Sequence, residues 1–414
     1  MSNSTTNTYQ MKRDILNYSK KISKGCTRNR QKFSADMIYG LLAAKSCVLS
    51  EIAHELQEPI RKKNTIDRLS RQLSEGIDKQ TDANYNRIIK KCLPEAPLVF
   101  VDDSEVIKPY GHKFEALGIV RDGSSKEKKH EKGYHVTEVT ALTRNSNHPV
   151  SLFSKIHSSC EKDFVSANAI TYDALKKVSA ITGKNATFVF DRGYDMNDLF
   201  SFCYKNDLQF IIRLTAKRLL FYKGKWFKST TLRDSRKGKI KTNVMFEGKK
   251  QPCYITCVNA QITESRKQIK VIFVYGLSDT PMMLATNREI LSKDDTIRVV
   301  RAYLQRWRIE EYFRFKKQHF GFENFRVRGL TAINALNTYL TYAIGLIALL
   351  SMKSKYNQLK ATVLSEANSL RLSVSFDYYR LAKGIAGLLQ NAHAGIKDWF
   401  KPLRPKYRQL SLFE

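Results

Sequence analysis

"APLVFVDDSEV", residues 96–106, is the stretch that decides how this chain folds. Residues 97–101 form an apolar run typical of a buried strand, and the run ends on Asp102 and Asp103. A carboxylate at the end of a strand projects from the carboxyl edge of an open sheet, where α/β proteins place their functional sites. We therefore expect an α/β fold with an acidic group at the edge of its sheet.

The next hundred residues continue this pattern of strands and helices. Strand-like runs are expected at 133–143, 149–157, 186–190 and 209–214, and helical runs at 164–181 and 195–206. Three strands, a helix, a strand, a helix and a strand in this order predict a mixed sheet. The strand at 186–190 ends on Asp191, which places a second carboxylate at a strand end.

The composition then changes, and these changes predict the domain boundaries. Residues 213–250 hold 13 basic residues against two acids, with short alternating runs and Gly-Lys turns typical of a small antiparallel sheet. A helix is expected to begin near Asp294 and to run through residues 303–321, and residues 329–414 have a helical pattern. We predict a helical region at 1–92, a catalytic core at 93–215 and 282–330, a β-rich insertion at 216–281, and a C-terminal helical region at 331–414.

The N-terminal region is a candidate DNA reader. Residues 1–32 are polar and basic, and we expect them to be partly disordered in the absence of DNA. From Phe33 to about Glu75 the pattern predicts short helices joined by turns, which is typical of a helix-turn-helix motif and also compatible with a plain helical bundle.

The charge of the chain limits its partners. The 414 residues include 71 Lys and Arg against 39 Asp and Glu, so the net charge is +32. Such a chain repels itself unless it meets a polyanion, which favours DNA and makes a neutral sugar substrate improbable. The basic residues are spread along the chain rather than gathered beside an apolar anchor, so we expect no membrane partner and interpret the apolar run at 335–352 as a buried helix.

The remaining composition indicates a cytoplasmic protein. The seven cysteines form no tight paired framework, which fits a reducing compartment. The N-terminal residues are polar and do not resemble a secretion signal.

A third acid is expected in "YLQRWRIEEYFRFKKQHFG", residues 303–321. On a continuous helix, Tyr303, Arg306, Glu310 and Lys317 share a face about 60° wide, whereas Glu311 falls well off it. One acid among two bases and a phenol suits a metal ligand flanked by phosphate-binding groups. A solvated helix with an Arg306–Glu310 pair is the alternative that this segment alone leaves open.

The same residues resemble a known family. The spacing Y-x2-R-x3-E-x6-K, met by Tyr303, Arg306, Glu310 and Lys317, is similar to the signature of bacterial cut-and-paste transposases of insertion sequence family four. "VFDRGYD" resembles the second aspartate motif of that family, and "FVDDSEVIKPYG" resembles its first aspartate region. The resemblance covers roughly residues 97–350.

The resemblance implies a ribonuclease-H-like catalytic core with an Asp-Asp-Glu triad. The triad corresponds to Asp102, Asp191 and Glu310, and it implies two bound Mg²⁺ or Mn²⁺ ions. The family pattern of Asp, any residue, then Thr or Ser selects Asp102 through Ser104, with Asp103 as the alternative. The implied activity is cleavage of double-stranded DNA at the terminal inverted repeats of an insertion sequence, followed by strand transfer to target DNA.

The resemblance also suggests DNA-binding residues and partners. Arg306 and Lys317 would hold phosphates and Tyr303 could hydrogen-bond one, while Arg213 and Arg218 would approach the DNA from the sheet. In family members that cleave through a hairpin, a flipped base stacks on an aromatic residue of the insertion, and Trp226 is the tryptophan found there; a buried strand residue is the alternative. A homodimer is expected in the synaptic complex, in the bacterial cytoplasm at the nucleoid.

Two rival functions remain at this point. One is a Mg²⁺-dependent DNA nuclease without strand transfer. The other is a domesticated transposase that binds DNA and no longer cuts it, although the three acids are intact.

Overall fold

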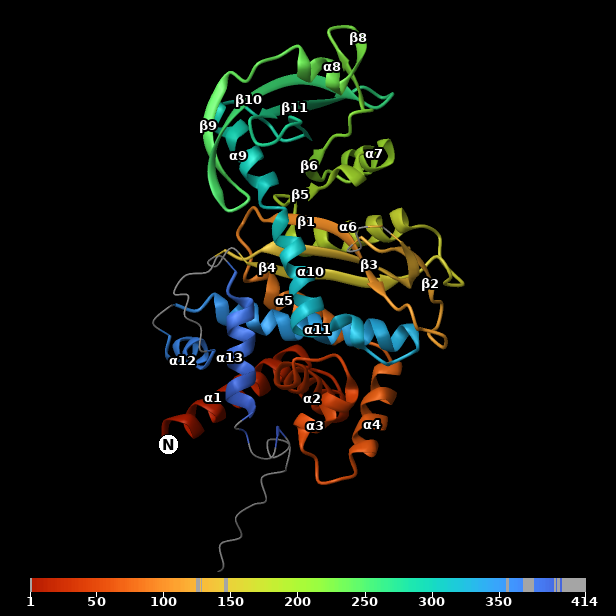
Figure 1. Cartoon of the computed structure of the whole chain (residues 1–414), viewed down its shortest axis with the longest axis vertical. Coiled ribbons are helices and arrows are strands. Elements are labelled where there is room, and N and C mark those ends of the chain that lie inside the picture. The colour runs from red at the N-terminus through yellow and green to blue at the C-terminus, as the bar shows by residue number, and fades with distance from the viewer. Residues whose placement is uncertain are drawn as a thin grey trace, which may run out of the picture.

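The protein is represented by a computed structural model that describes residues 2–123, 127, 129–144, 148–354, 357–367, 376–390, 392 and 395–396. Along the long axis of the molecule, the N-terminal helices lie at one end, the main sheet in the middle and a strand-rich part at the other end (Figure 1). The central sheet is the part that positions the acids.

The described residues form one 12-stranded sheet with the order β2-β3-β1-β5-β6-β12-β11-β10-β7-β8, in which β4 also pairs with β3 and β9 with β10. The strands are β1 Leu98–Ile107, β2 Gly118–Arg121, β3 His130–Leu142, β4 Pro149–His157, β5 Thr187–Phe190, β6 Gln209–Arg213, β7 Leu219–Tyr222, β8 Lys225–Lys228, β9 Ile240–Phe246, β10 Lys249–Ile262, β11 Lys267–Tyr275 and β12 Met282–Thr286. β1 is antiparallel to β3 and parallel to β5, and β5 is parallel to β6. The predicted mixed α/β fold, with a strand-rich part and flanking helices, is confirmed.

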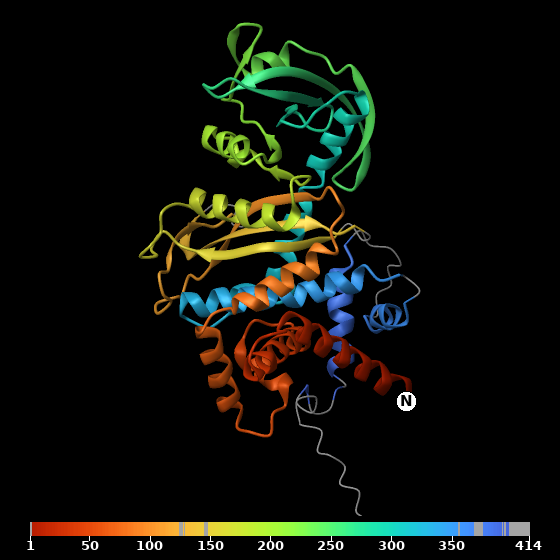
Figure 2. The same cartoon turned by 180° about the vertical axis from the view of Figure 1, so that it is seen from behind.

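Helices precede, cover and follow this sheet. They are α1 Ser2–Ile22, α2 Arg28–Ala44, α3 Leu49–Leu56, α4 Lys62–Ser74, α5 Lys79–Lys90, α6 Ala167–Thr182, α7 Asn197–Lys205, α8 Ser229–Asp234, α9 Lys293–Leu304, α10 Trp307–His319, α11 Leu330–Ser351, α12 Gln358–Glu366 and α13 Tyr378–Gln390, with 3₁₀ turns η1 Arg192–Tyr194 and η2 Phe322–Asn324. α10 crosses one face of the central strands and α6 covers the other, as the two opposite views show (Figures 1 and 2).

The alternation of side chains along β1 decides which acid faces which helix. Val99 and Val101 are buried in the apolar cluster that includes residues of α6, whereas Phe100 is buried in the second cluster, with residues of α9 and α10. Because successive strand residues point to opposite faces, Asp102 shares the face of Phe100 and Asp103 shares the face of Val101. Asp102 is thereby directed toward α10.

Helix α11 lies between the sheet and the N-terminal helices (Figure 1). It is long and apolar enough to cross a membrane by length and composition, but 83% of its most apolar window is buried inside the protein. The Asn334 side chain bonds both the backbone N–H and the C=O of Ile156, at 2.9 Å each, and so ties α11 to β4. The predicted buried helix is confirmed as a core helix.

The expectation that residues 1–32 are partly disordered was wrong. They contain α1 and the start of α2, and Met11, Ile15 and Ile22 of α1 are buried. The Tyr18 hydroxyl donates to the Tyr342 carbonyl of α11 at 2.9 Å. Apolar residues recur in α1 at helical spacing, so one face packs on the core although most of its residues are polar.

The helix expected from Asp294 through residue 321 is divided in two. α9 ends at Leu304 and α10 begins at Trp307. At the junction, the Arg306 and Ile309 N–H groups donate to carbonyls three residues back, at 2.9 and 3.0 Å, instead of four. This tighter turn changes the angle about the helix axis between Tyr303 and the residues of α10. The prediction that these residues share one face of a single continuous helix therefore rested on the wrong geometry.

Helix α13 supports α10 through aromatic contacts and packs closely on α12. The Phe315 ring of α10 lies 5.6 Å from Tyr378 and 5.0 Å from Tyr379. At Gly384, an added Cβ would lie 1.8 Å from the Val363 carbonyl oxygen of α12. The two helices can therefore approach this closely because residue 384 has no side chain.

We predict that Gly384→Ala lowers the free energy of unfolding by about 1–3 kcal/mol, because backbone atoms must move to admit the methyl group. Gly387→Ala is the matched control on the same helix. Its Cβ would meet the Glu366 Cγ at 2.9 Å, and this side chain can move. Alanine also favours a helix over glycine by up to about 1 kcal/mol. Urea denaturation of both variants tests this, and equal stabilities would contradict it.

Candidate active site at the carboxyl edge of the sheet

The first two acids come together because their strands are parallel neighbours. Val101 of β1 pairs with Phe190 of β5, and each strand residue is followed directly by an aspartate, Asp102 and Asp191. Asp191 follows the end of β5, whereas β1 continues to Ile107 and pairs with β3 through Asp102, so the expectation that the first strand ends at Asp102 was wrong. The parallel pairing still places Asp102 next to Asp191.

Asp103 has other partners on the opposite face. The Thr137 hydroxyl donates to its Oδ1 at 2.6 Å, and the Tyr194 hydroxyl donates to its Oδ2 at 2.8 Å. Both carboxylate oxygens are therefore engaged by neutral donors within the fold. This geometry favours Asp102 over Asp103 as the acid that faces α10.

Arg306 links the first and third acids. Its Nη1 donates to Asp102 Oδ2 at 3.0 Å, and its Nη2 donates to Glu310 Oε1 at 2.5 Å. The Glu310 side chain is 51% exposed, whereas that of Asp102 is 22% exposed. The predicted Arg306–Glu310 pair is present, and it also reaches Asp102.

Tyr303 connects the second acid to the same group. Its ring is buried, and its hydroxyl lies 3.4 Å from Asp191 Oδ1. Burial and the nearby Asp191 raise the pKa of Tyr303, while Arg306 and Arg213 oppose the rise. Tyr303 is therefore a neutral donor toward Asp191, and Arg213 lies beside it.

Burial dominates the electrostatics of Asp102, and the neighbouring charges modify its effect. Burial raises the pKa of Asp102 to about 7; Arg306 opposes this, and Asp103 and Asp191 add to it. For Arg306, burial lowers the pKa, but Asp102 and the other neighbouring anions outweigh it, so the net shift is upward. Arg306 is the internal cation of a site that holds more negative charge than one arginine balances.

The donor set suits a hard divalent cation. Carboxylate oxygens are the preferred protein ligands of Mg²⁺, and the raised pKa of Asp102 indicates a need for further positive charge. Across the described part of the chain, no three His, Cys, Asp or Glu side chains are grouped closely enough to hold one metal ion. In this arrangement the Arg306 guanidinium bridges Asp102 and Glu310, so a cation held by both acids would have to displace it.

Two other predicted DNA-binding residues are engaged in ion pairs. Lys317 Nζ lies 3.3 Å from Glu323 Oε1 and 4.0 Å from Glu105 Oε1. Arg218 donates through Nε to Asp195 Oδ1 at 2.7 Å, and the Asp195 side chain is fully buried. Arg218 contacts Asp195 rather than any of the three acids.

Trp226 lies in the β7–β8 hairpin, and its side chain is 43% exposed. The alternative that it is a buried strand residue was wrong. Its ring meets Phe221 edge-on, with centroids 5.3 Å apart. In the described sheet, β8 stands at the end of the strand order and pairs with β7.

Glu311 differs from its neighbour Glu310. Arg308 Nη1 donates to Glu311 Oε2 at 3.0 Å, within α10. Burial raises the pKa of Glu311, and Arg308 partly offsets the rise. The two adjacent glutamates thus have different partners, and Glu311 lies away from the cluster.

Sequence reasoning missed the residues that support the acids. Tyr194 and Thr137, which orient Asp103, were not singled out. Tyr194 follows Asp191 within the "DRGY" segment, and this proximity was the available signal. Glu138 and Lys316, a buried pair between β3 and α10, were also missed, because nothing in the sequence distinguishes them from solvated charges.

A family model described as "Transposase DDE domain" matches residues 95–346, a range that contains all three acids. No curated protein matches the chain. Among solved structures, it is similar to a piggyBac transposase synaptic complex with hairpin DNA, at 10% identity over 96% of this chain and 80% of that chain, with a TM-score of 0.43. It is also similar to a DNA-bound endonuclease V from Ciona intestinalis, at 10% identity over 58% of this chain and 100% of that chain. The NurA nuclease from Sulfolobus solfataricus is similar at 10% identity, over 58% of this chain and 83% of that chain. The TM-score is 0.26 for each nuclease.

We predict that the metal-free protein loses stability as the pH rises from about 4 to 7, relative to Asp102→Asn. The raised pKa of Asp102 means that the folded state holds this proton more tightly than the unfolded state does. In that window the unfolded state has already released the proton, so ionising Asp102 in the fold costs about 1.4 kcal/mol per pKa unit. Thermal unfolding in EDTA from pH 5 to 8 measures this, and parallel curves for the two proteins would contradict it.

Proposed function

The chain belongs to the family of transposases with a DDE domain, and from this premise we propose that it is a cut-and-paste transposase of insertion sequence family four. It would bind the ends of a bacterial insertion sequence, cleave the DNA there and transfer the freed strand. The observation that carries the proposal is the convergence of Asp102 and Glu310 on Arg306, with Asp191 at the neighbouring strand end.

In this proposal, Asp102, Asp191 and Glu310 hold two Mg²⁺ or Mn²⁺ ions. Bound divalent ions supply Lewis-acid activation of the attacking and leaving oxygens in an in-line phosphoryl displacement. Tyr303 orients Asp191 through its hydroxyl, and Thr137 and Tyr194 hold Asp103 on the other face. The side chains thus keep the first acid directed at the helix that carries the third.

The cations around the acids are the proposed phosphate-binding groups. Arg306 bridges Asp102 and Glu310 in this structure. When metal ions balance the charge of these acids, the Arg306 guanidinium would be free to bind a phosphate. Arg213 lies beside Tyr303 and is placed to contact the same strand of DNA. Lys317 would exchange Glu323 for a phosphate. For Arg218, the buried pair with Asp195 supports a role in fixing the start of the insertion.

We assign the remaining parts to DNA contacts and assembly. The proposed units are residues 1–92 as a DNA-binding helical region, 93–215 and 282–330 as the catalytic core, 216–281 as the insertion, and 331–414 as the C-terminal region. β12 supports the boundary at 282, because it joins β6 of the core to β11 of the insertion within one sheet. The net charge of +32 supports DNA as the partner, and synapsis of two ends would require a homodimer at the bacterial nucleoid.

We predict that Glu310→Gln slows cleavage of a plasmid carrying the terminal inverted repeats by more than about 100-fold. Even groups that only support a metal ligand typically contribute 10–100-fold. Glu311→Gln, the adjacent matched control, should stay within about tenfold of wild type, because its partner is Arg308. Gel shifts should show DNA binding by both variants. If Glu310→Gln cleaves like wild type, the catalytic assignment is wrong, and cut ends without joined products would favour the nuclease alternative.

We also predict that Trp226→Ala weakens binding of the transposon end by about 1–3 kcal/mol, the usual contribution of one base–aromatic stack. Met245→Ala is the control, because Met245 is an apolar residue of the same insertion and is 62% exposed. Fluorescence anisotropy with labelled ends measures both affinities. Equal affinities for the two variants would remove Trp226 from the DNA interface.

A further inference from the structure

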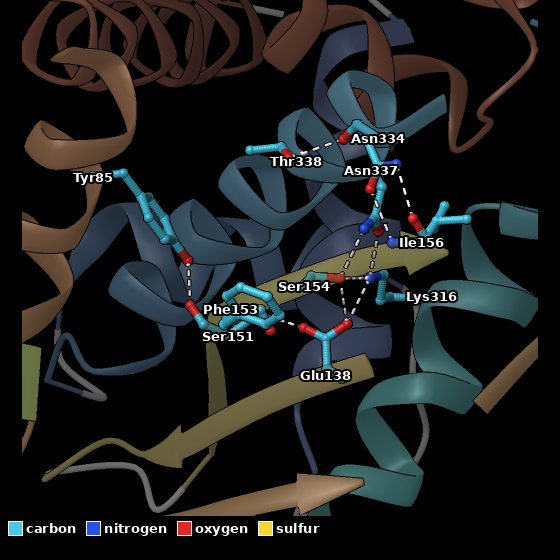
Figure 3. A network of polar contacts seen from close by, with 10 residues as sticks. All are labelled: Tyr85, Glu138, Ser151, Phe153, Ser154, Ile156, Lys316, Asn334, Asn337 and Thr338. Carbon is cyan, nitrogen blue, oxygen red and sulfur yellow. Dashed lines mark hydrogen bonds and ion pairs between the residues drawn. The ribbon is translucent and has the colours of Figure 1, made fainter. Parts of the chain in front are cut away.

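Behind the acids lies a buried ion pair between the sheet and α10. Lys316 Nζ lies 2.9 Å from Glu138 Oε2, and the side chains of the two residues are 1% and 0% exposed. Glu138 belongs to β3 and Lys316 to α10. Figure 3 shows the pair with side chains from β4 and α11 converging on it.

The donors of Lys316 and the oxygens of Glu138 all have partners. Besides Glu138, the Lys316 ammonium donates to Asn337 Oδ1 at 2.7 Å and to Ser154 Oγ at 3.3 Å. Ser154 donates to Glu138 Oε2 at 2.7 Å and accepts from Asn337 Nδ2 at 2.8 Å, and Ser151 donates to Glu138 Oε1. A lysine has three protons to give, and all three are used.

A β-bulge makes this saturation possible. The β3–β4 register shifts between Val139 and Thr140, so β4 carries one extra residue there. Without the shift, Ser151 and Ser154, three positions apart on one strand, would face opposite sides of the sheet. The bulge lets both hydroxyls reach the carboxylate of Glu138.

The pair joins α10, which carries the third acid, to β3, the strand that lies beside the one carrying the first acid. Glu138 is directly opposite Asp102 in the β1–β3 register. Lys316 follows Glu310 by six residues on α10. The network therefore ties the helix of Glu310 to the strand position that faces Asp102.

Stability does not explain the presence of a buried charge pair at this place in the fold. Burying two charges costs about as much as their attraction returns, and an apolar pair of similar volume is often equally stable or more so. A polar network in which every donor and acceptor has a partner specifies a single position of the helix. Its hydrogen bonds form only when the helix has one particular rotation and one particular translation relative to the sheet. Apolar packing alone would tolerate small shifts of α10 on the sheet.

We propose that Glu138 and Lys316, with Ser154 and Asn337, are positioning residues that set the rotation of α10 and hold Glu310 opposite Asp102. The inference rests on the proposed function, since it concerns the geometry of the same acids. Both charged side chains are buried, so their role is to position α10 and not to contact substrate.

The test replaces the pair by apolar residues of similar size, Glu138→Leu with Lys316→Met. We expect a folded protein whose thermal midpoint is at or above that of wild type. Its affinity for Mn²⁺, measured by isothermal titration without DNA, should fall about 10–100-fold, the usual effect of removing support from metal ligands. The kcat for cleavage should fall by a similar factor, while the KM for transposon ends stays constant.

A control removes another ion pair between two elements, in which Asp36 is buried and Arg68 is partly exposed. Asp36 and Arg68 join α2 to α4, at 2.8 Å, and neither helix carries one of the three acids. Asp36→Leu with Arg68→Met should leave the Mn²⁺ affinity unchanged. A loss of affinity as large as in the first double variant would mean that general loosening, and not the position of α10, is responsible.

A conservative variant keeps the proposal testable if the apolar pair does not fold. Glu138→Gln keeps the shape of the side chain and removes its charge, and we expect it to bind Mn²⁺ at least about threefold more weakly than wild type. Wild-type affinity and kcat in every folded variant of the pair would overturn the inference. Failure of the proposed function is seen separately, in a wild-type protein whose Mn²⁺ binding does not change on Glu310→Gln.

Discussion

The interaction at the centre of this structure is the pairing of one arginine, Arg306, with two carboxylates, Asp102 and Glu310. The parallel pairing of β1 and β5 places Asp102 next to Asp191, and α10 carries Glu310. Burial and the neighbouring acids raise the pKa of Asp102 to about 7, although Arg306 opposes the shift. A further cation at these acids, as proposed above, would favour the ionised form of Asp102.

Several separate groups of contacts hold the acidic residues and α10 in place. On one face of β1, Thr137 and Tyr194 hold Asp103, and the backbone then directs Asp102 to the other face.

α10 is fixed at its C-terminal half by the buried Lys316 network and by the aromatic contacts of Phe315 with α13. α11 joins these supports to the N-terminal helices, since Asn337 meets Lys316 and the Tyr342 carbonyl meets Tyr18. The strand-rich part at residues 216–281 continues the same sheet through β11, which pairs with β12.

The sequence was informative where local pattern decides structure. The apolar runs before Asp102 and Asp191 predicted β1 and β5, because apolar periodicity is a local property. The predicted end of the first strand was wrong, because pairing with β3 extends β1 to Ile107. The four-residue strand β2 was not predicted, since so short a run has little periodic signal. The break at Arg306 depends on how α9 and α10 pack, and the exposure of Trp226 depends on its place at the edge of the sheet. The buried pair of Glu138 and Lys316 was not predicted for the same reason. Burial of a charge depends on tertiary packing, and in the sequence both residues resemble surface residues.

The central claim is that Asp102, Asp191 and Glu310 form one cation site. The most direct measurement is anomalous diffraction from crystals of the protein soaked in Mn²⁺. We predict anomalous peaks in contact with the carboxylates of all three residues and an Arg306 side chain that no longer bridges Asp102 and Glu310. Crystals that show no peak at these carboxylates at millimolar Mn²⁺, with Arg306 still between the two acids, would contradict the claim.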